Sequence, residues 1–414
     1  MSQERQALEA LVRAQLRGPG RGVSRRGFLR GASLATLAVG VPSLLSACGT
    51  EAARQTTDSC QTDDKSETEK TLAISNWPLY IDQKRIKEGG QRRTVYPTIE
   101  AFQEESGITV EYTTDFNDNN EFFGIVRNQL ADCQPTGRDI FVPTDWMAAR
   151  MIDLGWIQTL DKKNLPNVEA NLVQSLRSPG WDAEREYSVP WQSGVTGMAY
   201  NSELTGEVRS FEELLTRSDL KGKVTLLSEM HDTMLFLLLM TGADPSDFTD
   251  DEFGVAIDRL GEAVQAGQIR AFTGNDYAQD LVEGNVLACE AWSGDVIQLQ
   301  FDNPNIKFVA PEEGLSLWSD NMLVPNQGMH KANAEAWMNF YYQPEIAAQV
   351  AAWVNFISPV EGAREAMTDI DPSLADNPLI FPDEEFLSNA YDFMSLDTKT
   401  EQKYQQMFAD VIGA

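Results

Sequence analysis

Leu72-Ala73-Ile74-Ser75-Asn76 is a short strand-like run that stops at Trp77-Pro78. The next segment, 98–106, has the spacing of a helix that ends at Gly107. Residues 108–112 then alternate between apolar and polar side chains, as in a half-buried strand. A strand, a helix and a strand in this order are typical of an α/β fold.

The same alternation continues along most of the chain. Further helices and strands are expected, in chain order, at 120–131, 139–142, 146–154, 224–227, 229–241, 251–266, 269–272, 278–283, 286–292 and 294–301. From residue 332 onward the pattern is mostly helical, at 332–342, 344–354, 361–367 and 398–412. The sequence therefore predicts an α/β fold with mainly parallel sheets.

Five loops that directly follow strands are candidates for a binding site, because ligands of α/β proteins bind where strands end. Four of these loops contain a tryptophan and four contain a carboxylate; they are 76–80, 143–146, 228–232, 292–295 and 318–320. A pocket built from both suits an organic cation. Carboxylates pair with ammonium groups, and an indole face attracts a cation by about 0.5–2 kcal/mol.

Simpler structural explanations compete with this interpretation. A tryptophan after a strand is more often part of the core than of a ligand site. N-capping alone would explain the carboxylates at four strand–helix junctions, Asp145, Glu229, Asp232 and Asp295. Asp320 is different, because it lies inside an apolar stretch, Leu315 to Pro325, where a carboxylate is costly without a positive partner. Asp320 is therefore the strongest single-residue prediction.

The first 47 residues have the features of an export signal. They contain seven Arg and two Glu, a net charge of +5. The pair Arg25-Arg26 and the mild apolar stretch 31–47 resemble a twin-arginine signal. The stretch ends in Leu45-Ser46-Ala47-Cys48, which is similar to a bacterial lipobox and implies cleavage before Cys48 and a lipid on its sulfur. A plain N-terminal membrane anchor is the alternative, but the stretch is short and weakly apolar for a span.

Residues 48–70 are predicted to be a polar tether, because they contain no large apolar residue after Cys48. No later run of about 20 apolar residues occurs, so nothing downstream is expected to span a bilayer. Cys60 lies in the tether. For the other two cysteines, a Cys133–Cys289 disulfide and two unpaired, buried thiols both stay open.

The chain is strongly acidic, with 33 Lys+Arg against 63 Asp+Glu and a net charge of −30, so the part from Cys48 onward carries −35. Such a field argues against nucleic acid and anionic lipid headgroups as partners, because their phosphates would be repelled. The two histidines exclude a His-rich metal site, and we expect neither a metal nor a cofactor. Hydrophobic residues make up 42%, which is enough for a full core.

The globular part resembles the spermidine/putrescine-binding proteins of bacterial ABC transporters, a family of extracytoplasmic type II solute receptors. The resemblance covers about Leu72 to Ala414 and rests on the order and spacing of several short motifs. These motifs are Ser75-Asn76-Trp77-Pro78-Leu79-Tyr80-Ile81, Asp139-Ile140-Phe141-Val142-Pro143-Thr144, Tyr187-Ser188-Val189-Pro190-Trp191, Tyr200-Asn201, Leu281-Val282-Glu283-Gly284, Ala291-Trp292-Ser293-Gly294-Asp295, Pro311-Glu312-Glu313-Gly314 and Trp318-Ser319-Asp320.

The resemblance implies a two-lobed type II periplasmic binding protein fold. Each lobe would be a mainly parallel sheet flanked by helices, with the ligand cleft between the lobes. The expected boundaries are 71–197 and 294–330 for lobe 1, and 198–293 and 331–414 for lobe 2. Crossing strands near 194–198 and near 292–295 would join the lobes.

The resemblance also implies ligand-binding roles. Trp77, Tyr80 and Trp292 would be aromatic contacts, Thr144 a hydroxyl contact, and the acidic residues partners of the amine. The full predicted set is Trp77, Tyr80, Thr144, Asp145, Glu229, Asp232, Trp292, Asp295 and Asp320. Pro78, Leu79 and a basic insertion around 83–94, expected near the mouth of the cleft, depart from the family pattern and leave room for an atypical ligand.

The expected function is therefore that of an exported, lipid-anchored receptor at the outer face of the cytoplasmic membrane. It would bind a polyamine by hinge closure and deliver it to ABC permease subunits, and we expect it to act as a monomer. The main alternative is a receptor of the same fold for another small solute, such as an amino-acid derivative, a sugar or a chelate. A secreted glycoside hydrolase with paired carboxylates is a remote alternative, because no hydrolase motif is found and we expect no enzyme activity.

Overall fold

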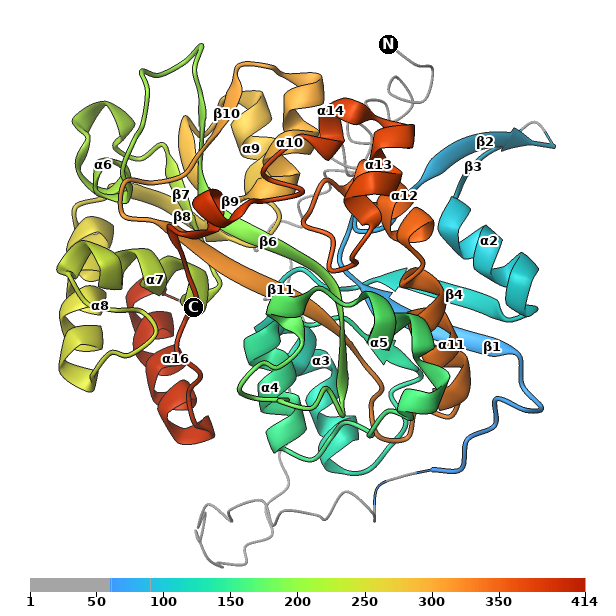
Figure 1. Ribbon diagram of the computed structural model, residues 1–414. Helices are drawn as coiled ribbons and strands as arrows, with labels where there is room; N and C mark the ends of the chain where they lie inside the picture. Colours follow the sequence, from blue (N-terminus) through green and yellow to red (C-terminus); the bar gives the residue numbers. More distant parts are fainter. Residues whose placement is uncertain (1–59, 61, 90, 414) are drawn as a thin grey trace, which may run out of the picture.

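Two groups of parallel strands form the centre of the molecule (Figure 1). The computed structural model describes residues 60, 62–89 and 91–413. In the first group, β1 (Thr71–Asn76) lies between β4 (Thr109–Thr114) and β5 (Ile140–Phe141). In the second, β7 (Val224–Leu227) lies between β8 (Ile269–Thr273) and β9 (Ala288–Trp292). The prediction of an α/β fold with mainly parallel strands is confirmed.

Two long strands join these groups into one sheet with the order β4-β1-β5-β11-β6-β9-β7-β8. β6 (Ser188–Asn201) is buried over its whole length and runs antiparallel to both β11 (Leu315–Leu323) and β9. Thr196 on β6 pairs with a residue of each neighbour, so one crossing lies within 194–198, as expected. The second crossing expected at 292–295 is wrong, because β9 ends there and a helix begins; β11 is the second linking strand.

Three short pairings complete the sheets. β10 (Ile306–Val309) lies antiparallel to β6, and β12 (Ala390–Tyr391) lies parallel to β11. β2 (Lys84–Glu88) and β3 (Gln91–Val95) form a separate antiparallel hairpin.

Helices fill the connections between these strands. They are α2 (Pro97–Ser106), α3 (Asn119–Ala131), α4 (Asp145–Asp153), α5 (Pro166–Asn171), α6 (Phe211–Thr216), α7 (Met230–Thr241), α8 (Asp250–Gln265), α9 (Tyr277–Glu283), α10 (Ser293–Asp302), α11 (Lys331–Tyr341), α12 (Pro344–Val354), α13 (Ala363–Ile370), α14 (Pro372–Ala375), α15 (Glu384–Leu387) and α16 (Thr398–Ile412), with 3₁₀ turns at Lys162–Asn164, Gln174–Leu176 and Ser218–Leu220.

Local chemistry fixes several of the helix ends. α2 ends at Gly107, whose φ of 70° is easily adopted only without a side chain. α3 begins after Asp118, whose carboxylate accepts from the backbone N–H of Glu121. α8 begins with a capping box in which Thr249 and Glu252 bond each other's backbone.

The buried apolar residues form two hydrophobic clusters. The smaller one packs β7, α7 and α8 together with Tyr404 and Phe408 of α16. The larger one contains the β1 side of the sheet, β9, α9, α10 and α11–α14; within it α11 packs on α5 and β1, and α12 packs on α2 and α10 (Figure 1). The assignment of all of 331–414 to the lobe of 198–293 stays a prediction.

The second half of the predicted tether belongs to the folded domain. Lys65 N–H donates to Met329 O at 2.7 Å, and Asn333 N–H donates to the hydroxyl of Ser66, which is 3% exposed. The Asp64 carboxylate accepts from the backbone N–H of Ala332 at the start of α11. The prediction of a free leash up to residue 70 is thus wrong for 62–70, because hydrogen bonds to the α11 region order this polar segment without an apolar anchor.

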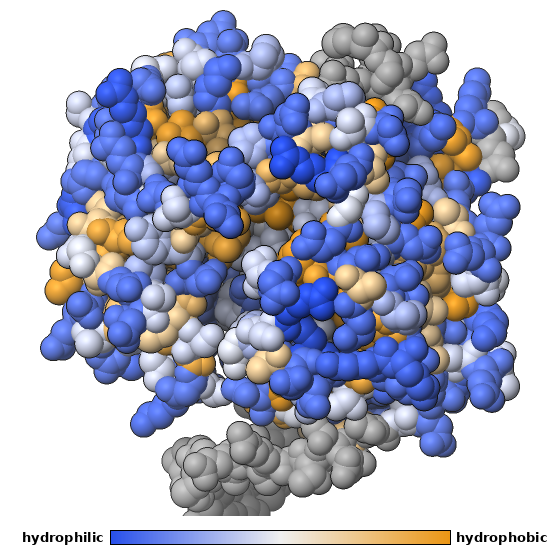
Figure 2. Space-filling model, viewed as in Figure 1, coloured by the Kyte–Doolittle hydropathy of each residue, from blue (hydrophilic) through white to orange (hydrophobic). Residues whose placement is uncertain are grey.

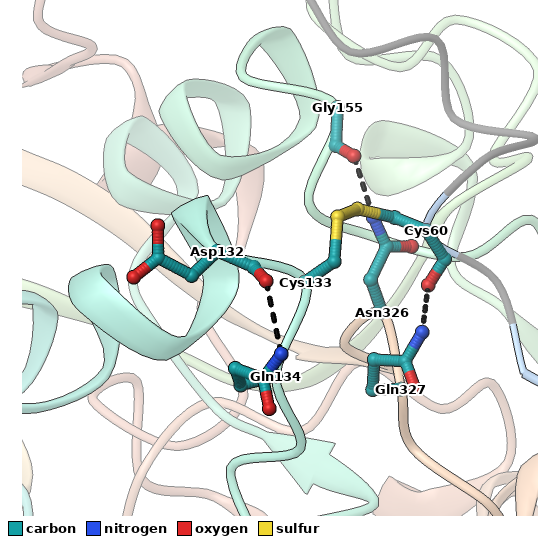
Figure 3. Close-up of a disulfide and its surroundings, with 7 residues drawn as sticks. All are labelled: Cys60, Asp132, Cys133, Gln134, Gly155, Asn326 and Gln327. Carbon is teal, nitrogen blue, oxygen red and sulfur yellow. Dashed lines mark hydrogen bonds between the residues drawn. A yellow bond between two sulfur atoms is a disulfide. The ribbon is translucent and has the colours of Figure 1, made fainter.

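A disulfide joins Cys60 to Cys133, just beyond the end of α3 (Figure 3). The side-chain amide of Gln327 donates to Cys60 O at 2.6 Å and fixes the chain beside the bridge. A Cys133–Cys289 pairing is therefore excluded, and Cys289 is a buried free thiol. A bridge with a sequence separation of 73 stabilises a fold by about 3–4 kcal/mol, mainly by restricting the unfolded chain.

Candidate functional site

The strand ends of both parallel groups face one cleft. The residues that follow β1, β5, β7 and β9, together with part of β11, line a cavity of about 860 Å³. The space-filling view shows a hollow between the two halves of the molecule (Figure 2). This position follows from topology, because the carboxyl ends of parallel strands open at one edge, and β6 and β11 turn the two edges toward each other.

All nine residues predicted from the sequence line this cleft. They are Trp77, Tyr80, Thr144, Asp145, Glu229, Asp232, Trp292, Asp295 and Asp320. Arg25, Arg26 and Cys48, predicted for export and lipidation, lie outside the described residues. The basic hairpin β2–β3 does not line the cleft, so among the described residues the expected insertion at its mouth is wrong.

Asp320 projects from β11 and receives two hydroxyl groups from lobe 1. Tyr80 OH donates to its Oδ2 at 2.7 Å, and Thr144 Oγ1 donates to its Oδ1 at 2.8 Å. Leu79 has a φ of 57°, an unusual value for a leucine, and this turn directs the next residue toward Asp320. Burial raises the pKa of Asp320 to about 7, although these two hydrogen bonds act to lower it. The nearby Asp145 adds to the rise.

Glu229 joins the two parallel groups directly. It follows β7 as the N-cap residue of α7, yet its Oε1 accepts from the backbone N–H and the side-chain amide of Asn119, at 2.8 and 3.0 Å. The same Asn119 amide donates to Thr144 Oγ1, so the network continues to Asp320. The Oε2 atom of Glu229 is buried and has no hydrogen-bond partner among the residues that the structure describes. Burial raises the pKa of Glu229 well above its ordinary value, and Asp118 adds to this.

Asp232 lies one helical turn after Glu229 and accepts from two neutral groups. Thr196 Oγ1 donates to Oδ1 at 2.6 Å, and the indole Nε1 of Trp292 donates to Oδ2 at 3.3 Å. The Trp318 indole in turn donates to Thr196, so β6, β9 and β11 meet at this carboxylate. Burial raises the pKa of Asp232.

Asp295 and Asp145 occupy the first turns of α10 and α4. Asp295 Oδ2 accepts from Tyr277 OH at 2.9 Å and from the Asn275 amide at 3.3 Å. Asp145 accepts from the backbone N–H of Trp146. Burial raises the pKa of both carboxyls to about 6, with a further contribution from Asp392 at Asp145. Helix capping explains Asp145 in part, because its carboxylate accepts from a backbone N–H in the first turn of α4. It does not explain Asp295, whose carboxylate accepts from side chains.

Aromatic rings form the walls between these carboxyls. The ring centroids of Trp77 and Trp292 are 6.3 Å apart, and the Trp77 indole donates to Val142 O at 2.8 Å. Tyr80 meets Phe356 edge to face at 5.2 Å, and Trp318 lies 5.6 Å from Phe356. These rings present faces and edges to the cleft in the arrangement that suits an alkyl chain with charged ends.

The five carboxyls share one further property. In the part of the chain that the structure describes, none of them forms an ion pair with a lysine or an arginine; every hydrogen bond to them comes from a hydroxyl, an amide, an indole or a backbone N–H. Buried carboxyls without a cation carry a desolvation cost, which explains why every pKa in the set is raised. The site is therefore short of positive charge.

Sequence reasoning missed several residues of the cleft. Asn119 and Asn275 follow β4 and β8, so the strand-end rule would have found them if it had not been limited to tryptophans and carboxylates. His231 lines the cleft and stacks on Trp146 at 4.4 Å, although it looked like an ordinary first-turn residue of α7. Phe356 follows α12 and gave no signal in the sequence.

Two kinds of structural feature are not found in the described part of the chain. Among the described residues, no group of three or more His, Cys, Asp or Glu side chains is arranged to hold a metal ion. Within the same residues, no helix is long and apolar enough to cross a membrane.

The chain is similar to bacterial solute-binding proteins over most of its length. Residues 98–382 match the family of bacterial extracellular solute-binding proteins. The spermidine/putrescine-binding periplasmic protein of Escherichia coli K12 is 24% identical over 344 residues, which cover 82% of this chain and 92% of the relative. The putrescine-binding periplasmic protein of the same organism is 26% identical over 356 residues, which cover 81% and 89%.

A solved structure supports the fold. The spermidine/putrescine ABC transporter substrate-binding protein of Streptococcus pneumoniae superposes with a TM-score of 0.65 at 24% identity, over 83% of this chain and 98% of that one. The predicted two-lobed periplasmic binding protein fold is therefore confirmed. With a family match over well more than half of its residues, the chain belongs to the bacterial extracellular solute-binding protein family.

Proposed function

We propose that this protein is the receptor of an ABC transporter and binds a polyamine in its cleft. The observation that carries the proposal is a set of five cleft carboxyls, three buried (Glu229, Asp232, Asp320) and two half-buried (Asp145, Asp295), without a lysine or arginine partner among the described residues. A linear polycation supplies the missing charges at several points along one chain. The similarity to polyamine-binding relatives supports the same ligand class.

Lobe closure is the proposed means of capture. Residues of both parallel groups would grip the amine, with Asp320 on one side and Asp232 and Asp295 on the other. The unpartnered Oε2 of Glu229 offers a further acceptor for an ammonium N–H. Carboxylates that face each other without a ligand repel, so the cation favours the closed form by cancelling this repulsion. The gain depends on complete hydrogen bonding, because each buried ion pair also loses hydration.

A zwitterionic solute, such as an amino-acid derivative, fits this cleft less well. Its carboxylate would need a free cation, and Arg185 is the buried arginine among the lining residues. The Arg185 guanidinium already donates to Leu176 O, Ser188 and Asn321. A glycoside hydrolase needs two carboxyls with pKa values pushed apart, whereas all five here are raised together. We therefore propose that the protein binds its solute without chemical change.

Titration calorimetry of the purified protein with putrescine, spermidine and spermine tests the proposal. We expect binding at about micromolar affinity or tighter for at least one of them. Butylamine and 4-aminobutanoate are matched control ligands for putrescine, since each keeps one ammonium and the four-carbon skeleton but carries a methyl group or a carboxylate in place of the second aminomethyl group. Neither should bind comparably. If all three polyamines give no heat and no thermal shift at millimolar concentration, the polyamine assignment is wrong.

We also propose that the chain is exported through its Arg25-Arg26 signal and anchored by a lipid on Cys48, as a monomer. The motif around Cys48 and the extracytoplasmic family support this. In a bacterial host fed a labelled fatty acid, the wild-type chain should be labelled and fractionate with membranes. Cys48→Ala should lose the label. Labelling that persists in Cys48→Ala would contradict the lipid site, whereas loss of label in Cys60→Ala would only report on stability of the fold.

A further inference from the structure

The hairpin β2–β3 is presented on a rigid base. Figure 1 shows it extending outward beside α2, on the side of the molecule away from α8 and α16. At its start, the Asp82 carboxylate is 4% exposed and accepts from Thr98 N–H and from the Gln349 amide at 2.8 Å. At its end, Val95 is buried and the Tyr96 ring lies 5.3 Å from Tyr112. Among the described strands, the two between these anchors pair only with each other.

The hairpin concentrates positive charge. Residues 84–95 contain three Arg, two Lys and one Glu, a net charge of +4 in a chain whose total is −30. Lys87 and Arg92 are exposed and pair directly across the two strands. Arg85 lies on the same face, because side chains two residues apart along a strand point to the same side.

Like charges directly opposite each other destabilise a β-ladder. Neither the Lys87 nor the Arg92 side chain forms a hydrogen bond or an ion pair with another residue in the described ranges. An anion bound over this face would offset the repulsion between Lys87 and Arg92. This face of the hairpin is therefore a candidate surface for binding a negatively charged partner.

The composition of this face favours a lipid surface over a protein. Protein interfaces have an apolar or aromatic centre and are poor in lysine. The face of Arg85, Lys87, Arg92 and Thr94 has no apolar side chain. Binding to anionic headgroups needs only clustered cations, each contributing about 1 kcal/mol near the surface. The acidic remainder of the protein is repelled by the same headgroups, so the hairpin would also define which side of the molecule faces them.

We propose that the Arg85–Lys87–Arg92 face of the hairpin binds the anionic phospholipid headgroups of a membrane and orients the receptor on it. This contact is separate from the solute cleft, which the hairpin does not line. It is electrostatic and is therefore weakened by salt.

Vesicle co-sedimentation tests the proposal with the full chain carrying Cys48→Ala, so that no lipid is attached. We expect binding to vesicles of equal parts phosphatidylglycerol and phosphatidylcholine at low salt, and none to pure phosphatidylcholine. Lys87→Gln with Arg92→Gln should reduce the partition coefficient about tenfold or more. Raising the salt to about 0.5 M should have a similar effect on the parent chain.

Two control pairs remove the same number of charges elsewhere. Lys221→Gln with Lys223→Gln changes exposed residues beside β7, and Arg25→Gln with Arg26→Gln changes the basic N-terminal segment. Both should bind vesicles more tightly than the hairpin variant does, and all variants should keep the parent melting temperature and solute affinity. The proposal is overturned if the hairpin variant binds as the parent does, if the N-terminal pair alone abolishes binding, or if the parent binds no anionic vesicle at low salt. The last result would instead favour an acidic protein partner.

Discussion

Asp320→Asn should lower polyamine affinity about a hundredfold. The substitution keeps the shape of the side chain but removes the charge on β11 that would pair with an ammonium group. Removing one partner of a buried, hydrogen-bonded charge pair costs about 2–5 kcal/mol. Calorimetric titration of the variant with the tightest polyamine measures the loss. An unchanged affinity would mean that Asp320 has only a structural role.

The same substitution should stabilise the ligand-free protein at neutral pH. Burial raises the pKa of Asp320 from 3.8 to about 7, so ionising it in the folded state costs up to roughly 4 kcal/mol. Between pH 4 and 7 the folded protein then holds a proton that the unfolded chain has lost, and stability from this group falls as pH rises through that window. At pH 7.5 we expect Asp320→Asn to raise the melting temperature of the free protein by about 2–4 °C.

Glu290→Gln is a matched control for both effects. Glu290 is fully buried, accepts from Leu227 N–H and from Thr233, and has a pKa that burial raises well above its ordinary value. It does not line the cleft. Glu290→Gln should therefore stabilise the free protein while leaving polyamine affinity within about threefold of the parent, since Glu290 makes no contact with the cleft, although the nearby Asp232 contributes to its raised pKa. A large loss of affinity in this control would show that the effect of Asp320→Asn is not local.

Polyamine affinity should fall steeply as pH decreases from 7.5 to 5.5. In the free protein, burial raises the pKa of Asp320 to about 7 and those of Asp145 and Asp295 to about 6. A bound cation favours the ionised carboxylates, so protons must leave on binding when the pH lies below these values. The alkylammonium groups themselves stay protonated throughout this range, because their pKa is near 10. We expect the affinity to decrease about tenfold or more over the two pH units.

Calorimetry in buffers of different ionisation enthalpy checks this directly. Near pH 6.5 the observed heat should depend on the buffer in the sense of proton release from the protein. In Asp320→Asn the carboxyl with a pKa of about 7 is absent, so the pH dependence should be shallower. An affinity that is constant or higher at pH 5.5 would contradict ionised carboxylates as the partners of the amine.

Much of the fold could be predicted because its elements carry local signals. The helices at 344–354 and 398–412 have the bounds predicted from apolar spacing, since Pro344 begins one of them and Asp397 caps the other. The hairpin at 84–95 was not predicted as two strands, because its side chains are mostly charged and lack the alternation of a half-buried strand. The packing of α11 and α12 was also not predicted, because an amphipathic pattern shows that a face is buried and not what covers it.

The residues of the site could be predicted from the sequence more completely than the long-range contacts that hold them in place. Strand-end loops converge by topology, so Asp232, Asp295 and Asp320 could be grouped from sequence alone. The contact between Asn119 and Glu229 could not, because 110 residues separate them and neither belongs to a local motif. Likewise, the hydrogen bonds of 62–70 to the α11 region join groups more than 260 residues apart, such as Asp64 with Ala332, and no local pattern indicates them.

The Cys60–Cys133 bridge has a consequence for where the receptor operates. Without it the first fixed point of the domain would be Asp64, which bonds the start of α11, so the bridge shortens the stretch after Cys48 from 16 residues to 12. Twelve residues reach at most about 40 Å when fully extended. With a lipid on Cys48, the receptor would therefore stay within about 40 Å of the bilayer surface, and reduction of this one bond would lengthen that reach by about 13 Å.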